Sequence, residues 1–151
     1  MTDKKYTPTT HEDFVPEIRA AGAIVAYVAG PYRAETHAGV YANIQRARHV
    51  AGNLWFLGYA VICPHLNSAF MSGPVDEKNF LDGYLELVRR ADIVVLTTDI
   101  AGISGTGTQK EYELARELGI PVVSHNGIPP AEEVTRRVWG KYPERCGKEN
   151  E

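Results

Sequence analysis

The sequence predicts one α/β domain of the doubly wound kind, flavodoxin-like or Rossmann-like, with a mainly parallel sheet of four to five strands. Short apolar runs rich in β-branched residues alternate along the chain with segments of helical periodicity. This alternation is typical of right-handed βαβ units, in which helices cover both faces of a parallel sheet. We expect residues 21–140 to form the domain, between an N-terminal arm (residues 1–20) and a polar C-terminal tail (residues 141–151).

Apolar runs predict four strands, over residues 23–29, 59–63, 92–98 and 121–124. The first and third runs are nearly continuous in apolar residues, as in strands that are buried on both faces. We predict the spatial order 2-1-3-4, because this order sends the chain to opposite faces of the sheet after strands one and two. Ligands of such sheets bind outside the carboxyl ends of the strands at the switch point, here between strands one and three.

Helical periodicity predicts four helices, over residues 38–57, 77–90, 108–118 and 131–139. In the first helix, five apolar residues recur on one face: Val40, Ile44, Ala47, Ala51 and Leu54. Gly58 and Gly119 follow the first and third helices, and glycine commonly ends a helix. We expect residues 64–67 to belong to a loop.

Composition argues against several classes of function. The net charge is −3 and the basic residues form only short pairs such as Arg89-Arg90, so we expect no nucleic-acid partner. No apolar run approaches the roughly 20 residues that span a bilayer, and residues 1–13 lack a signal-peptide core. Two distant cysteines and five scattered histidines indicate neither disulfides nor a metal site. We therefore expect a cytoplasmic protein without metal, cofactor or membrane partner; FMN on a flavodoxin-like sheet is an alternative.

The loop after the first strand is the first candidate wall of a ligand site. It reads Gly30-Pro31-Tyr32-Arg33. Glycine lets the backbone approach a ligand closely, the helix that follows favours an anion at its N-terminus, and Arg33 adds a forked charged donor. The alternative is a plain turn with a solvated arginine.

The loop after the third strand is the second candidate wall. It contains Ser104, Gly105, Thr106, Gly107 and Thr108. Hydroxyls and free amides at a helix start can hold phosphate or sugar hydroxyls, although the loop is neither a G-x-G-x-x-G nor a Walker motif.

Three further polar residues lie near these loops. Glu111 falls in the first turn of the predicted third helix, where the helix dipole favours the ionised carboxylate. A routine acid that complements the dipole is the alternative. His65, after the second strand, and Asn43, on the first helix, are candidate ligand contacts. An exposed loop histidine and a surface asparagine are the respective alternatives.

Several motifs together resemble one known group of proteins. They are Tyr27-Val-Ala-Gly-Pro-Tyr-Arg33, Asn43-Ile-x-x-Ala47, Pro64-His65, Ala91-Asp-Ile-Val-Val95 and Gly107-Thr-x-x-Glu111-x-x-x-Ala115-x-x-x-Gly119. In this order and spacing they resemble the nucleoside 2-deoxyribosyltransferase superfamily, and within it the DUF4406-type branch of short proteins. The resemblance covers roughly residues 23 to 124.

The resemblance implies an enzyme that binds a nucleoside or nucleotide and cleaves or transfers its N-glycosidic bond, as a hydrolase or a transferase. Glu111 matches the nucleophile of that superfamily, the Gly30–Arg33 loop its site for the sugar and the 5′ end, and His65 its base pocket. Carboxylate attack at C1′ would divide one difficult displacement into two easier ones. The resemblance also implies a homo-oligomer.

Two departures from the pattern bear on catalysis. Relatives carry an aspartate eight residues before the position of Asp92, where this chain has Tyr84, and Asp99 is the candidate substitute for that acid. They also carry a serine where this chain has Gly105, which Ser104 and Thr106 flank. A general acid contributes about 10²–10⁴-fold in rate, so a catalytically inactive nucleotide-binding or sensor module is the alternative function.

Overall fold

The strands form an all-parallel sheet in the order β2-β1-β3-β4, in a computed structural model that describes residues 24–71, 73–129, 131 and 134. They are β1 (Val25–Ala29), β2 (Ala60–Ile62), β3 (Ile93–Leu96) and β4 (Val122–Ser124). At the carboxyl ends of the two central strands, Ala29 of β1 lies opposite Leu96 of β3. The fold class and the strand order predicted from the sequence are confirmed.

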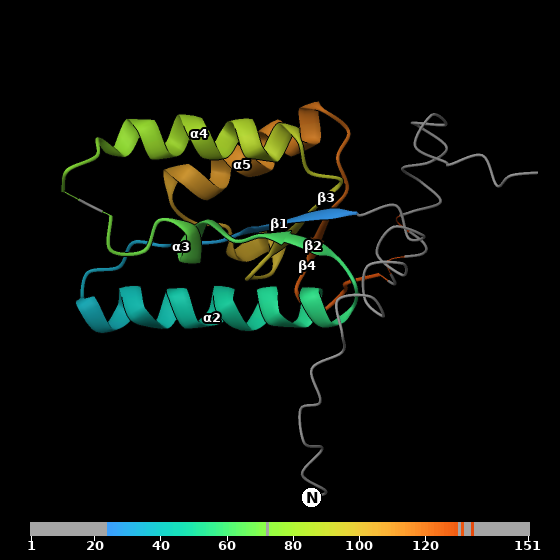
Figure 1. Ribbon diagram of the computed structural model, residues 1–151, viewed down its shortest axis with the longest axis horizontal. Helices are drawn as coiled ribbons and strands as arrows, with labels where there is room; N and C mark the ends of the chain where they lie inside the picture. Colours follow the sequence, from blue (N-terminus) through green and yellow to red (C-terminus); the bar gives the residue numbers. More distant parts are fainter. Residues whose placement is uncertain (1–23, 72, 130, 132–133, 135–151) are drawn as a thin grey trace, which may run out of the picture.

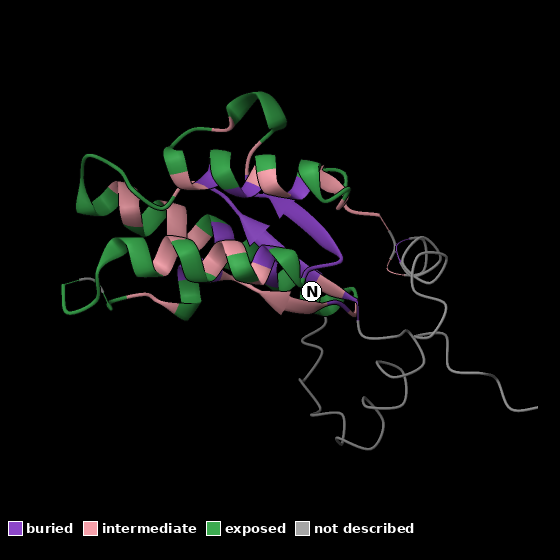
Figure 2. Cartoon of the chain, turned by 90° about the horizontal axis from the view of Figure 1, so that it is seen from above, coloured by how far each residue is buried: buried purple, intermediate pink, exposed green. Residues whose placement is uncertain are grey.

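Helices cover both faces of this sheet (Figure 1). Helix α2 (His37–Phe56) lies on one face, and α4 (Glu77–Arg89) and α5 (Thr106–Glu117) lie together on the other. Successive residues of a strand point to opposite faces. In β1, Ala26 and Val28 pack with α2, whereas Tyr27 and Ala29 pack on the face of α4 and α5. This two-sided burial explains why the strand is apolar throughout (Figure 2).

Helix α2 spans almost the predicted range. Thr36 caps it by accepting a hydrogen bond from the backbone N–H of Gly39, and Gly58 follows its end with a φ of 90°. The buried residues of the helix are Ala47, Val50, Ala51 and Leu54. Val40 and Ile44, which the periodicity placed on the same face, are only half-buried.

The segment 64–67 is a short helix, α3 (Pro64–Asn67), so the prediction of a loop there was wrong. Proline suits the first turn of a helix because its missing N–H would have no helical partner there. The turn closes with hydrogen bonds from the N–H groups of Asn67 and Ser68 to the carbonyls of Cys63 and Pro64. This turn brings His65 and Pro64 into the interior, where both are buried.

Helix α5 begins at Thr106, two residues before the predicted start. Gly105 precedes it with a φ of 84°, a left-handed conformation that suits glycine. A Cβ atom on Gly107 would lie 3.8 Å from Leu81 Cδ1 on α4, an ordinary van der Waals contact. The earlier start moves Glu111 into the second turn, and the prediction of a first-turn acid was wrong. A short 3₁₀ helix, η1 (Ile100–Gly102), precedes this turn.

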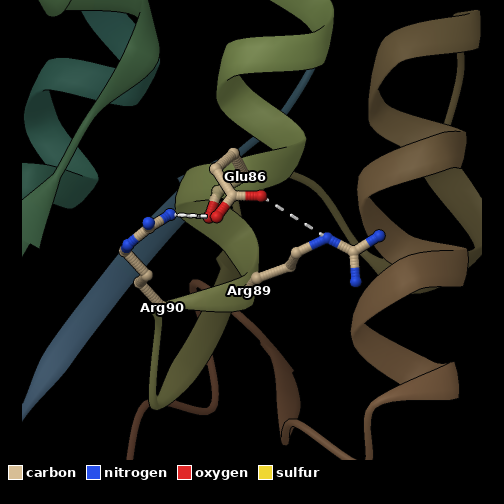
Figure 3. Close-up of polar contacts among 3 residues, drawn as sticks. All are labelled: Glu86, Arg89 and Arg90. Carbon is tan, nitrogen blue, oxygen red and sulfur yellow. Dashed lines mark hydrogen bonds and ion pairs between the residues drawn. The ribbon is translucent and has the colours of Figure 1, made fainter.

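The basic pair at the end of α4 belongs to the surface of that helix. Figure 3 shows Arg89 and Arg90 paired with Glu86, one turn earlier; the Arg89 Nε to Glu86 Oε2 distance is 3.7 Å. All three side chains are more than half exposed. Such pairs contribute little to stability, about 0.3–0.5 kcal/mol each.

Several predictions concern residues outside the described part of the chain. They are the arm 1–20, most of the helix predicted over 131–139, and the tail 141–151. None of the helices that the structure describes combines the length and apolar character needed to span a bilayer.

Candidate functional site

The topological switch point lies where the sequence predicted it. β1 has β2 on one side and β3 on the other, and the chain leaves β1 and β3 toward opposite faces of the sheet. The segment that starts at Gly30 and the segment from Thr97 to Gly105 therefore border the carboxyl ends of the central strands. Open α/β sheets bind their ligands at this place.

A tyrosine and a glutamate from distant parts of the chain meet beside this edge. Tyr27 of β1 donates its hydroxyl to Glu111 Oε1 of α5 over 2.6 Å. Tyr27 is fully buried, and Glu111 is 8% exposed. A buried tyrosine hydroxyl needs an acceptor, and a carboxylate is a strong one. The pair therefore fixes the direction of the Glu111 side chain.

Burial determines the acid–base properties of this pair. It raises the pKa of Glu111 from 4.5 to about 7, and the hydrogen bond from Tyr27 opposes the rise. The pKa of Tyr27 is raised first by burial and then by the negative charge of Glu111. The tyrosine therefore keeps its proton, and the carboxyl group exchanges its own near neutral pH.

The second oxygen of Glu111 accepts no hydrogen bond from any described residue. It is also not among the buried polar side-chain atoms without a partner, which in the described part of the chain are Nδ1 of His65 and Nδ1 of His125. One oxygen of Glu111 is therefore held, and the other has no hydrogen-bond partner among the described residues.

Tyr84, on α4, lies close to the Tyr27–Glu111 pair. Its hydroxyl and the Cys63 thiol are close enough to Tyr27 to raise the pKa of Tyr27 slightly. Tyr84 donates to Ser68 Oγ at 2.5 Å and lies 3.2 Å from the Pro64 carbonyl oxygen. It thereby joins α4 to α3 at the edge of the site.

Packing accounts for the glycine at position 30, and its predicted role in letting a ligand approach the backbone stays a prediction. Gly30 is buried, and a Cβ atom at this position would lie 2.0 Å from Thr97 Oγ1. Thr97, directly after β3, is itself buried and donates its N–H to the Ala29 carbonyl. Glycine therefore lets the two loops leave the sheet side by side.

The rest of this loop is exposed apart from Pro31, which is half-buried. The guanidinium of Arg33 pairs with Glu77, the first residue of α4. The Arg33 side chain is 76% exposed, so it remains open to a competing anion. Asn43 donates its amide to the carbonyls of Tyr32 and Arg33, so the structure shows it supporting the loop.

His65 is buried, so the alternative of an exposed loop histidine was wrong. Its Nε2 lies 3.1 Å from the Pro31 carbonyl, and its ring lies 5.9 Å from the Tyr32 ring. A carbonyl only accepts, so Nε2 carries the proton and Nδ1 is the unprotonated nitrogen. Burial lowers the pKa of His65, which keeps the ring neutral at pH 7.

The residues of the second predicted wall, Ser104 to Thr108, face two different surroundings where α5 begins. Ser104, Gly105 and Thr106 line an open hollow of about 540 Å³ together with Ile103, Gln109, Lys110 and Glu113. Gly107 is half-buried and Thr108 is buried, on the inner side of the helix with Glu111. The hollow therefore does not include the glutamate.

Asp99 lies past the carboxyl end of β3 and is exposed. Its Oδ1 accepts a hydrogen bond of 3.4 Å from Ser124 Oγ on the edge strand β4. Its described side-chain contact is thus to β4 and not to Glu111. Within the described residues, no group of three or more His, Cys, Asp or Glu side chains could hold a metal ion.

Tyr27 is the main site residue that the sequence reasoning missed. The sequence placed it in an apolar strand and in one motif of the resemblance, but not among the candidate site residues. A tyrosine in a strand buried on both faces was nevertheless a usable signal, because its hydroxyl needs a buried partner.

No family model matches this chain, and a search of curated proteins returns no match. The resemblance to the nucleoside 2-deoxyribosyltransferase superfamily therefore stays a prediction from the motifs. The geometry of the site is the independent basis for a functional proposal.

Proposed function

We propose that this protein binds a nucleoside or nucleotide and cleaves or transfers its N-glycosidic bond, with Glu111 as the nucleophile. The observation that carries the proposal is the buried carboxyl group beside the switch point. One of its oxygens is held by Tyr27 at 2.6 Å, and the other lacks a described partner. Carboxyl groups with strongly shifted pKa values are frequently found at functional sites.

In the proposed reaction, the free oxygen of ionised Glu111 attacks C1′ of the sugar. The bond from C1′ to the base nitrogen breaks, and its electron pair leaves with the base. The base takes a proton from an acid, for which Asp99 and solvent are the candidates. Water or a second base then attacks C1′ and gives its proton to the conjugate base of that acid, while the bond from C1′ to Glu111 breaks and the carboxylate is released.

The ionisation of Glu111 sets the pH dependence of this reaction. A nucleophile must be ionised, so kcat/KM should rise with pH through about 7, the pKa of Glu111 in the free protein. A glutamate that acted as a general acid would show the opposite slope. The sign of the slope thus separates the two roles.

The test is base release from a panel of nucleosides and nucleoside 5′-monophosphates, followed by chromatography. We expect release by the wild type and at least a 10³-fold loss in Glu111→Gln, on the order observed when nucleophiles are removed. Glu113→Gln is the matched control, because Glu113 lies on the same helix and is exposed. Release from no member of the panel, or equal release by Glu111→Gln, would overturn the proposal.

A second candidate is a nucleotide-binding or sensor module without catalysis. Tyr84 in place of the expected acid favours it, as does the hydrogen bond that joins Asp99 to Ser124. Its signature would be a rise in thermal stability on nucleotide binding while no base appears. Turnover of the same nucleotide would exclude it.

The proposal includes a cytoplasmic setting, a small-molecule ligand and a homo-oligomeric state. The half-buried, unpaired Cys63 fits a reducing compartment. Light scattering on the purified chain tests the oligomeric state, and a monomer at all concentrations would contradict that part of the proposal.

A further inference from the structure

Asn43 joins helix α2 to the loop after β1 through its side chain alone. Its Nδ2 lies 3.2 Å from both the Tyr32 and the Arg33 carbonyl oxygens. Arg46, one turn further along α2, donates from Nη1 to Asn43 Oδ1 over 3.1 Å. Because a guanidinium only donates and a carbonyl only accepts, this arrangement fixes which end of the amide faces the loop.

Three successive carbonyls of the loop are thereby occupied. His65 of α3 holds the Pro31 carbonyl, and Asn43 holds those of Tyr32 and Arg33. By contrast, no described residue accepts a hydrogen bond from the N–H groups of Tyr32 or Arg33. The backbone groups that the loop offers to a ligand are therefore donors, which suit the oxygens of a phosphate or a sugar.

We propose that Asn43 is a positioning residue, which holds the Tyr32–Arg33 turn in its ligand-binding geometry before the ligand arrives. Arg46 supports it by orienting the amide. The inference rests on the proposed function only in taking this loop as a wall of the ligand site. The clamp itself is a property of the protein without ligand and is testable there.

Limited trypsin digestion of the ligand-free protein tests the clamp, because Arg33 is itself a trypsin site in the held turn. Cleavage after Arg33 is followed by mass spectrometry, and cleavage after Arg116 within α5 reports global unfolding. The variants are Asn43→Asp, which keeps the shape but cannot donate, and Asn43→Ala. Asn53→Ala, at an exposed position of the same helix, is the control.

We expect both Asn43 variants to be cleaved after Arg33 about tenfold faster than the wild type, as the loss of two hydrogen bonds would allow. Cleavage after Arg116 should be unchanged, and Arg46→Ala should give a smaller effect of the same sign. Wild-type rates at Arg33 in Asn43→Asp would overturn the proposal. A parallel rise at both sites would overturn it too, because it would assign Asn43 to general stability.

Titration calorimetry with inorganic phosphate and a nucleoside 5′-monophosphate supplies the second readout. Asn43→Ala, which adds no charge that could repel an anion, should weaken the binding of both about tenfold, while the pH at which base release becomes half-maximal stays that of the wild type. Faster cleavage with unchanged binding would reduce Asn43 to a purely structural role and overturn the proposal. Failure of the proposed function would show separately, as absence of base release from the wild type.

Discussion

The buried surroundings of Glu111 disfavour the ionised form of its carboxyl group. The side chain is 8% exposed, its single described hydrogen bond comes from Tyr27, and burial raises its pKa to about 7. A glutamine of the same shape could accept the same hydrogen bond without carrying a charge. The carboxyl group therefore costs stability at neutral pH, which is typical of residues kept for function.

Glu111→Gln should make the protein more stable at high pH. Between pH 4.5 and 7 the unfolded state releases the glutamate proton while the folded state retains it, so wild-type stability falls as pH rises. The variant lacks this loss. We compare the free energy of unfolding of the variant with that of the wild type. The difference, in favour of the variant, should be about 3 kcal/mol larger at pH 8 than at pH 4. Denaturant unfolding at both pH values measures this.

The exposed Glu113 supplies the control, since Glu113→Gln should show no such divergence between the two pH values. A wild-type and Glu111→Gln difference that is equal at pH 4 and pH 8 would show that Glu111 is not buried as described.

Tyr27→Phe should shift the activity profile to higher pH. The hydrogen bond from Tyr27 favours the ionised form of Glu111, so its removal raises the pKa of that carboxyl further. Base release at pH 7 should fall, with partial recovery at pH 9. Tyr112→Phe is the control, because no described residue bonds to the Tyr112 hydroxyl. An unchanged profile in Tyr27→Phe would contradict the role given to this hydrogen bond.

Gly30→Ala should destabilise the fold by about 1–3 kcal/mol, because its Cβ would lie 2.0 Å from Thr97 Oγ1. Removing that hydroxyl in Thr97→Ala should reduce the cost of the alanine. Gly52→Ala, on the exposed side of α2 with nothing within 4 Å of its Cβ, should instead stabilise by about 0.5–1 kcal/mol. Thermal unfolding measures all three, and a neutral Gly30→Ala would contradict the packing argument.

At the scale of elements, helix ends account for the largest difference between prediction and structure. The alternation of Gly105, Thr106 and Gly107 resembles a loop, because glycine is a poor helix former. The structure nevertheless includes Gly107 in α5, which begins at Thr106. The earlier helix start carries Glu111 beyond the first turn, where the dipole no longer dominates, and burial reverses the expected direction of its pKa shift.

The contact between α3 and α4 makes a separate prediction. Tyr84 links the two helices through Ser68 and Pro64. Tyr84→Phe should cost about 1–2 kcal/mol of stability, since it leaves partly buried groups without their partner. Tyr112→Phe, half-buried on α5, should be nearly neutral. Equal unfolding midpoints for the two variants would show that Tyr84 does not hold α3 in place.

At the scale of the whole molecule, the sheet could be predicted and the site only in part. Continuous apolar runs and right-handed crossovers were enough to derive the order β2-β1-β3-β4 and the switch point between β1 and β3. The contact of Tyr27 with Glu111 joins residues 84 positions apart. It depends on how α4 and α5 pack together on one face, which no local pattern in the sequence specifies.

The central claim is that the free oxygen of Glu111 bonds to C1′ during turnover. The most direct measurement is the mass of the protein after a rapid quench during turnover of nucleosides and nucleoside 5′-monophosphates. The proposed mechanism predicts a sugar adduct on the peptide that contains Glu111, and no adduct in Glu111→Gln. Base release without an adduct, or an adduct on another residue, would contradict it.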